Sequence, residues 1–340
     1  MWAFLYLEDR KLQLVGAKPF KEHGELVDIL IEREMEIADR DRAERKLSQV
    51  GYYRLSGIWY PFREIEFNGN EEPVMAYGKP KRLSKFLPHT TFDDVFALYI
   101  FDKRLRILFL DAIERIEINV RNVMAHTLGK HDPMAYLNDS FINPKNCQDL
   151  YPSKNKWEKL QDRHQEELGR CQEECINWHR KTNREIPIWA AVEAWSLGSI
   201  SKYYGLLKGG YQNEIAKAVG ASNANAFGHW LQVLNRLRNG CAHHARIWNQ
   251  TINNPIKLPS DQGKDDTTYF SSFELSVNSR KNLYGQIVLT WFLVQKIGPN
   301  SDWIQHVIDE IEEINKLSLP FDPIHAMGIP EGGLELDKFI

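Results

Sequence analysis

Two hexapeptides in this chain share the pattern Arg-Asn-x-x-Ala-His, and their residue types could do chemistry. They are Arg121-Asn-Val-Met-Ala-His126 and Arg238-Asn-Gly-Cys-Ala-His243. In a chain with 11 histidines, an arginine five residues before a histidine arises by chance, but a repeat that also shares Asn and Ala does not. On a helix, the asparagine and the histidine share a face, so the amide can orient the imidazole. The long arginine side chain can reach the same pocket.

These side chains suit the cleavage of a phosphodiester. Histidine moves a proton near neutral pH, and a guanidinium stabilises the charge that grows on the phosphate. No carboxylate cluster of metal-binding type accompanies either motif, so we expect a metal-independent attack by a ribose 2′-hydroxyl, with no cofactor. That hydroxyl makes RNA the predicted substrate. The predicted catalytic residues are Arg238, Asn239, His243, Arg121, Asn122 and His126.

The charge near the motifs supports a polyanionic ligand. The whole chain has 43 basic and 46 acidic residues, which argues against coating nucleic acid through bulk charge. Residues 118–131 and 215–260 nevertheless contain no Asp or Glu. The alternative is structural: Arg121 or Arg238 would pair with a carboxylate elsewhere, for instance Glu114 or Glu117.

Other residues could contact RNA through positive charge or an aromatic ring. Residues 51–62 hold five aromatic side chains, which favours a packing plug between helices, with base stacking as the alternative. Residues 78–85 carry four positive charges, which are more often a solvated surface than a phosphate contact. The predicted RNA-binding residues are Arg236, His244, Arg246, Lys130, Lys79, Lys81, Arg82, Lys85, Tyr52, Tyr53 and Arg54.

The elements that must position these residues are helices. From Thr91, apolar residues recur at helical spacing with no Pro or Gly until Gly129, which predicts one helix of about 35 residues. The pattern predicts further helices over 157–182, 188–208, 225–247, 280–297 and 301–317, with Gly209-Gly210 as a helix end. The only strands that we expect are in short hairpins, at 65–67 and 269–277. The predicted fold class is all-α.

The cysteines and the hydropathy argue against a zinc site, an oxidising compartment and a membrane span. His164, Cys171, Cys175 and His179 fall on one stripe of the predicted helix over 157–182, and its ends lie about 22 Å apart. One straight helix cannot place them around a tetrahedral zinc, so a buried face is favoured over a metal site. Four cysteines without a regular framework favour a reducing, cytoplasmic compartment. Met1 to Leu7 is too short for a signal peptide, and no apolar run predicts a membrane span.

The motifs resemble a known family. Arg-Asn-x3-His on a helix resembles the active-site motif of HEPN ribonucleases. Three strings are similar to the Abi-like proteins of bacterial abortive infection, and the resemblance covers about residues 20–330. The strings are Gly51-Tyr-Tyr-Arg-Leu-Ser-Gly-Ile-Trp-Tyr-Pro-Phe62, Leu98-Tyr-Ile-Phe-Asp-Lys-Arg-Leu-Arg106 and Arg238-Asn-Gly-Cys-Ala-His-His-Ala-Arg-Ile-Trp-Asn249. Two motifs in one chain also resemble the RNA-guided type VI CRISPR effectors, which join two HEPN motifs in one composite site.

The resemblance implies HEPN-type helical bundles and metal-independent endoribonuclease activity in phage defence. We expect an N-terminal unit over 20–145 with the first motif, a C-terminal unit over 146–320 with the second, and a tail over 321–340. Both motifs would meet on an RNA cleft, within one chain or across a homodimer. The alternative is a non-catalytic protein that holds a small structured non-coding RNA in the same basic groove. A third possibility is a purely structural partner of a toxin.

Overall fold

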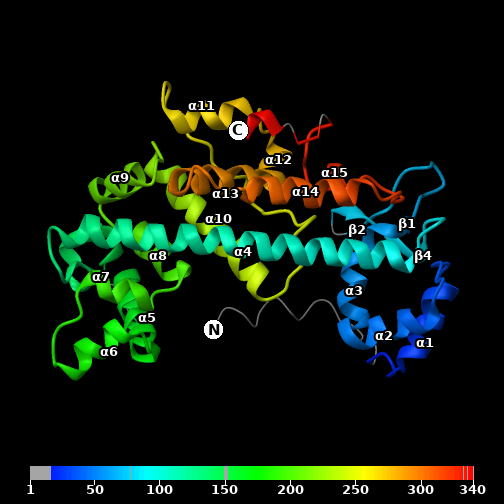
Figure 1. Ribbon diagram of the computed structural model, residues 1–340, viewed down its shortest axis with the longest axis horizontal. Coiled ribbons are helices and arrows are strands. Elements are labelled where there is room, and N and C mark those ends of the chain that lie inside the picture. Colours follow the sequence, from blue (N-terminus) through cyan, green and yellow to red (C-terminus); the bar gives the residue numbers. More distant parts are fainter. Residues whose placement is uncertain (1–16, 77, 149–151, 332, 335, 340) are drawn as a thin grey trace. The chain divides into compact units, whose positions relative to one another are not determined.

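The computed structural model describes residues 17–76, 78–148, 152–331, 333–334 and 336–339. Within them the chain is mostly helical, with two small antiparallel strand pairs, so the predicted all-α class is confirmed (Figure 1). The segment Met1 to Leu7 lies outside the described residues. The chain forms two compact units, which divide between Val95 and Phe96. The sequence-based division at 145–146 does not coincide with this boundary, and both motifs lie in the second unit.

The first unit combines three helices with the strands. Their bounds are α1 His23–Glu32, α2 Arg40–Val50, α3 Tyr52–Ile58, the 3-10 turn η1 Tyr60–Phe62, β1 Arg63–Ile65, β2 Met75–Ala76, β3 Lys79–Pro80 and β4 Arg82–Phe86. Strand β1 pairs with β4, and β2 pairs with β3. Trp59 is fully buried and meets Phe86 edge to face at 6.2 Å. The aromatic segment therefore packs this unit through Trp59 and through Phe62, which is also buried.

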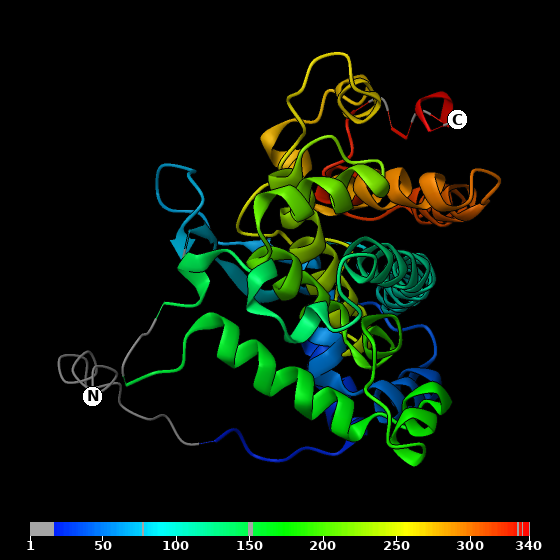
Figure 2. The same ribbon diagram turned by 90° about the vertical axis from the view of Figure 1, so that its left-hand side faces the viewer.

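The longest element is α4, which runs from Phe92 to Gly129 over 38 residues. It confirms the predicted helix of about 35 residues, because no Pro or Gly interrupts its apolar stripe. In the second unit α14 (Trp303–Asn315) lies along it (Figures 1 and 2). Trp303 packs on Phe109 at 5.6 Å, and its Nε1–H donates to the Leu108 carbonyl at 2.7 Å.

The remaining elements belong to the second unit. They are η2 Ala135–Leu137, η3 Asp139–Phe141, η4 Pro144–Asn146, α5 Lys156–Arg170, α6 Glu174–Lys181, α7 Ile188–Ala191, η5 Val192–Ala194, α8 Leu197–Leu206, α9 Gly209–Ala218, α10 Ala224–Ala242, α11 Asp265–Ser272, α12 Val277–Lys281, α13 Leu283–Ile297, α15 Pro323–Ala326 and η6 Leu336–Lys338. Helix α13 is buried at every position from Leu283 to Val294. Near the carboxyl end, the Phe339 carbonyl accepts from Trp291 Nε1 at 2.7 Å, so that part of the tail is docked.

Several predicted helix bounds are wrong. The helix over 157–182 breaks at Cys171, which is extended, so the four-residue metal stripe does not exist. The helix over 188–208 breaks at Trp195, and Ser196 caps α8 by accepting from the Ser199 amide. Gly209-Gly210 begins α9 instead of ending a helix. The possible hairpin over 269–277 does not form, because residues 269–272 belong to α11 and a turn follows, and the helix predicted to Ile247 ends at Ala242.

None of the helices in the described part of the chain combines the length and the apolar character that a bilayer crossing requires.

Candidate nucleic-acid interface

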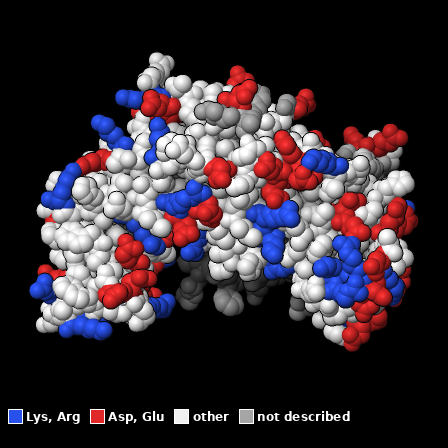
Figure 3. Space-filling view, in the orientation of Figure 1, with Lys and Arg blue, Asp and Glu red and all other residues white. Residues whose placement is uncertain are grey.

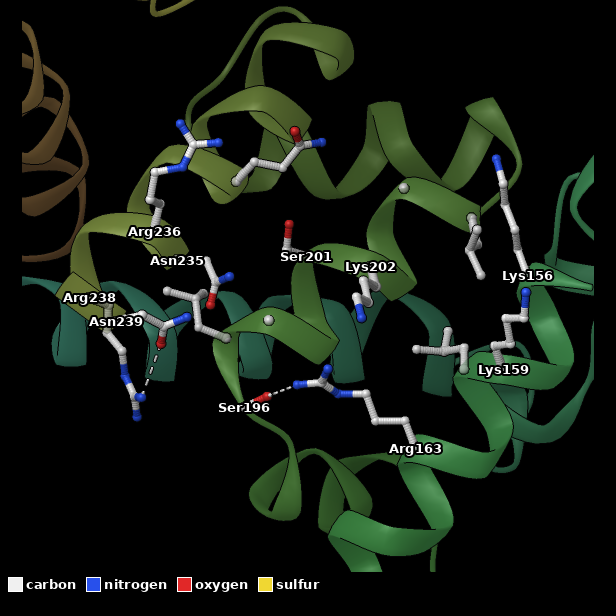
Figure 4. Close-up of a pocket in the computed structure, with 16 residues that line it drawn as sticks. Lys156, Lys159, Arg163, Ser196, Ser201, Lys202, Asn235, Arg236, Arg238 and Asn239 are labelled. Carbon is white, nitrogen blue, oxygen red and sulfur yellow. Dashed lines mark hydrogen bonds between the residues drawn. The ribbon is translucent and has the colours of Figure 1, made fainter. Parts of the chain in front are cut away.

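A groove with a volume of about 1050 Å³ lies between α5, α8 and α10 in the second unit (Figure 4). Among the described residues, the lining holds no carboxylate and six cationic side chains: Lys156, Lys159, Arg163, Lys202, Arg236 and Arg238. Figure 4 shows the α5 and α10 side chains on opposite sides, with Lys202 of α8 between them. A groove lined by one sign of charge concentrates ligands of the opposite sign, so this site suits a polyanion.

Helix α5 supplies one wall through its start and its spacing. Asn155 accepts from the Glu158 amide at 2.9 Å, while the Glu158 carboxylate accepts from the Asn155 amide at 2.9 Å. This capping box fixes the first turn. Lys156, Lys159 and Arg163 then follow at i, i+3 and i+7, which places all three on one face.

Arg163 is held in the wall by hydrogen bonds. Its Nε donates to Ser199 Oγ at 2.6 Å and its Nη2 donates to Ser196 Oγ at 3.0 Å. Both hydroxyls also donate to one carboxylate oxygen of Glu167 at 2.8 Å, and Arg163 itself lies 3.3 Å from that oxygen. Glu167 does not line the groove, so it offsets the charge of Arg163 from behind.

Helices α8 and α10 come close together along the floor of the groove. Gly198, Ser201, Lys202 and Gly205 share one face of α8 and all line the groove. A Cβ at Gly198 would lie 3.3 Å from Asn235 Oδ1 and 3.4 Å from Arg163 Nη2, which is tighter than ordinary packing. Glycine at this position therefore lets the two walls approach.

The second motif is the carboxyl end of α10. Arg238 and Asn239 both line the groove, with Arg238 Nη1 3.5 Å from Asn239 Oδ1. The helix ends at Ala242, and His243 stands exposed at its carboxyl cap. His244 is exposed and has a positive φ of 59°, which closes the helix with a hydrogen bond from the Ala245 amide to the Gly240 carbonyl at 2.8 Å.

A buried ion pair on α4 anchors the turn after this motif. Asp102 accepts from the amides of Ile247 at 2.8 Å and Trp248 at 2.9 Å, and it pairs with Arg106. Arg106 also donates to the Ala245 carbonyl at 3.3 Å. Burial raises the pKa of Asp102, while Arg106 and the two amides oppose that rise. These contacts fix where the chain leaves His243 and His244.

Cys241 occupies a free position of the second motif and points into the core. It is 1% exposed, and burial raises its pKa to about 12. Arg246 is half-buried, and burial is the main cause that lowers its pKa. Arg236 has an effect beyond its own position: burial, then Lys257 and Arg236, lower the pKa of His229. Lys257 and Arg236 are therefore close enough to His229 to act on it, although burial is the main cause.

The first motif lies in different surroundings. Arg121 Nη2 pairs with Glu117 at 2.5 Å and donates to the Trp195 carbonyl at 2.5 Å, and Nη1 lies 3.8 Å from Glu193. The ion pair that the structural alternative predicted, with Glu117, is thus present. Lys130 pairs with Glu214.

Asn122 and His126 are exposed on α4 and line a separate pocket of about 300 Å³. This pocket shares no described lining residue with the groove. One chain of contacts links the motifs: Arg121 holds the Trp195 carbonyl, and the next residue, Ser196, lines the groove.

The predicted contacts in the first unit are mostly engaged internally. Lys81 pairs with Glu66 at 2.5 Å, and Lys85 pairs with Glu34 at 2.8 Å. Arg82 donates to the carbonyls of Pro61, at 2.8 Å, and Arg63. The Tyr52 hydroxyl accepts from Arg33 at 2.9 Å. Lys79, Tyr53 and Arg54 are exposed, and Lys81 and Lys85 are exposed as well despite their ion pairs.

Sequence reasoning missed four groove residues: Lys156, Lys159, Arg163 and Lys202. The spacing of the first three was a readable signal, because it puts three cations on one helical face. Across the face shown in Figure 3, both signs of charge are interspersed, so net charge does not reveal the groove. Within the described residues, no three His, Cys, Asp or Glu side chains gather as a metal site requires.

Comparisons with known proteins place the chain by family. The family model described as Abi-like protein matches residues 45–249, which include both motifs and all the groove residues. Neither the search of the curated proteins nor that of the solved structures found a match. The matched segment is more than half of the 340 residues, and it confirms the resemblance of the three strings to Abi-like proteins: the chain belongs to the Abi-like protein family.

Proposed function

We propose that this protein is a metal-independent endoribonuclease of a bacterial abortive-infection system. Family membership supports the abortive-infection role. The observation that carries the nuclease assignment is the groove between α5, α8 and α10, whose described lining joins Arg238 and Asn239 with five further cations and no carboxylate. Phosphates of a nucleic-acid backbone are the ligands that such a surface favours.

The chemistry follows from the second motif. Arg238 and Asn239 hold the scissile phosphate, and the guanidinium stabilises the charge that develops on it. His243, exposed at the carboxyl cap of α10 one turn after Asn239 and outside the described groove lining, takes the proton of the 2′-hydroxyl as its oxygen bonds to phosphorus. The bond to the 5′-oxygen breaks, and that oxygen takes up a proton. The products are a 2′,3′-cyclic phosphate and a 5′-hydroxyl.

Lys156, Lys159 and Lys202 extend the basic surface away from Arg238 (Figure 4). Among the described residues none of the three forms an ion pair, so their ammonium groups are available to flanking phosphates. They position the strand without reading its sequence.

The test is cleavage of end-labelled RNA in the presence of a chelator. Wild-type protein should produce fragments with cyclic phosphate ends, and His243→Ala should lose cleavage by about 100-fold or more. His306→Ala is the matched control, because this half-exposed histidine lies on α14, outside the groove lining. Full activity in His243→Ala would refute the assignment. Copurified RNA that Arg238→Ala releases, with no product at any pH, would instead favour the non-catalytic RNA-binding alternative.

A further inference from the structure

The pocket of about 300 Å³ beside the first motif has the components of a nucleotide site. Its lining comprises Asn122, Ala125, His126, Gly129, Lys130 and Trp189. An aromatic face, an amide, an imidazole and an ammonium group thus meet in a space at the lower end of the range for small-molecule pockets. The proposed cleavage reaction does not use this pocket.

Trp189 is 54% exposed and, with Trp178, is one of two exposed tryptophans among the described residues. It is presented by α7, whose preceding residue in the helix, Ile188, is fully buried. The Ile188 amide donates to the Pro133 carbonyl at 2.7 Å, which ties the start of α7 to the segment after α4. The backbone that carries Trp189 is therefore fixed, although the indole ring faces solvent.

Gly129 sets how the indole meets α4. A Cβ at this position would lie 3.1 Å from Trp189 Cε3 and 3.1 Å from Ile188 Cγ2. Only a residue without a side chain lets the indole lie against the last turn of α4 without displacement. Asn122 and His126 come from the same helix four residues apart, so their polar atoms stand on the face beside the ring.

We propose that this pocket binds one unpaired nucleotide, with its base stacked on Trp189. Stacking on an exposed aromatic ring is sequence-tolerant, because every base has a π-face. Asn122 supplies both a donor and an acceptor for a base edge, as an amide does for adenine. Lys130, half of whose side chain stays exposed while it pairs with Glu214, supplies the charge for the phosphate.

The test measures binding by calorimetry with three probes: 5′-AMP, ribose 5-phosphate and an eight-residue oligoadenylate. AMP should bind wild-type protein, ribose 5-phosphate should bind far more weakly, and Trp189→Ala should weaken AMP binding about tenfold or more. Trp189→Phe should retain most of the affinity, because it keeps an aromatic face. Gly129→Ala should also weaken AMP binding, because the added Cβ would displace the Trp189 ring from the side of α4. Trp178→Ala is the matched control, since Trp178 is 46% exposed on α6 and does not line the pocket.

The oligoadenylate arm distinguishes the source of the nucleotide. Weaker binding of both probes to Trp189→Ala identifies a base within a strand, whereas an effect on AMP alone identifies a free nucleotide. If Trp189→Ala weakens the binding of neither AMP nor the oligoadenylate, the proposal is wrong. A change of sedimentation mass in that variant, without a change in binding, would reassign the ring to a protein interface and also overturn it. His243→Ala should bind AMP normally, so failure of the cleavage assignment is seen separately.

Discussion

The two Arg-Asn-x-x-Ala-His motifs share four residues but differ in what their arginines contact. Arg238 lines a groove whose described residues include no carboxylate, whereas Arg121 is held by Glu117 and by the Trp195 carbonyl. In the sequence, both motifs lie in windows without Asp or Glu. Folding brings the buried Asp102 to the turn after the second motif but no carboxylate into the described groove lining, whereas Glu193 and Glu214 pair directly with Arg121 and Lys130. An acid-free window therefore predicts an electropositive site only where the neighbouring elements are also free of acids.

The largest expected effect is on catalysis at the second motif. Arg238→Ala should lower RNA cleavage by about 100-fold or more, because a guanidinium that stabilises developing charge is lost. Arg238 bonds only weakly within the fold, with 3.5 Å to Asn239, so the free energy of unfolding should barely change. Cleavage rates and urea denaturation of the same preparation measure both quantities. A large loss of stability without loss of cleavage would contradict the distinction between the motifs.

Arg121→Ala should act mainly on stability. The side chains of Arg121 and Glu117 are only 19% and 10% exposed, so truncation leaves a mostly buried carboxylate and the Trp195 carbonyl without their donor. The expected loss is about 1–3 kcal/mol in the free energy of unfolding. Arg115→Ala is the control on the same helix, because its pair with Asp111 is more exposed, with side chains 37% and 57% exposed. Equal destabilisation by both variants would remove the special role given to Arg121.

His164 predicts a pH dependence for the segment between the motifs. It stacks on Trp195 at 4.2 Å, and burial, followed by Arg163, lowers its pKa from 6.5 to about 3. The unfolded chain takes up a proton that the folded chain refuses, so stability is lost as pH falls through 6.5 towards 3. From pH 7 to pH 5 this amounts to about 2 kcal/mol.

The matched variant for this prediction is His164→Phe. It keeps an aromatic ring on Trp195 and breaks no hydrogen bond, since neither ring nitrogen has a partner among the described residues. Denaturation curves at pH 7 and pH 5 should show a smaller acid loss in the variant. An identical loss in both proteins would place the acid sensitivity elsewhere.

The smallest effect compares two lysines. Lys202→Ala should weaken RNA binding by less than tenfold and reduce the slope of log affinity against log salt by about 0.7, the value of one phosphate contact on a single strand. Lys81→Ala should change neither, because Lys81 pairs with Glu66. A salt titration of fluorescence anisotropy measures both. An unchanged slope for Lys202→Ala would show that the strand does not enter the groove beside α8.

Local sequence signals predicted much of the fold but not its breaks. The 38-residue α4 was predictable because its apolar stripe contains no helix breaker. Gly169, two residues before the break at Cys171, and the Ser196 cap of α8 were both readable signals that the prediction missed. The pair Gly209-Gly210 favours the end of a helix, but in the structure these two residues begin α9 because tertiary contacts override that preference.

The candidate site was likewise predictable where the signal is local and not where it depends on tertiary packing. The pair of Arg121 with Glu117 is visible at i and i+4 spacing, and it was weighed from the sequence. The cationic face of Lys156 and Lys159 is equally local. That this face lies opposite Arg236, more than 70 residues downstream, depends on how α8 and α10 pack, which no local pattern encodes.

The burial of Cys241 has a chemical consequence for the second motif. Oxidants and alkylating agents attack the thiolate, and with a pKa of about 12 only about one thiol in 10⁵ is ionised at pH 7. The only sulfur within the motif is therefore inert under oxidative stress. A thiol-reactive label added to the folded protein will attach first to Cys175, the exposed cysteine, and will leave the Arg238–His243 segment unmodified.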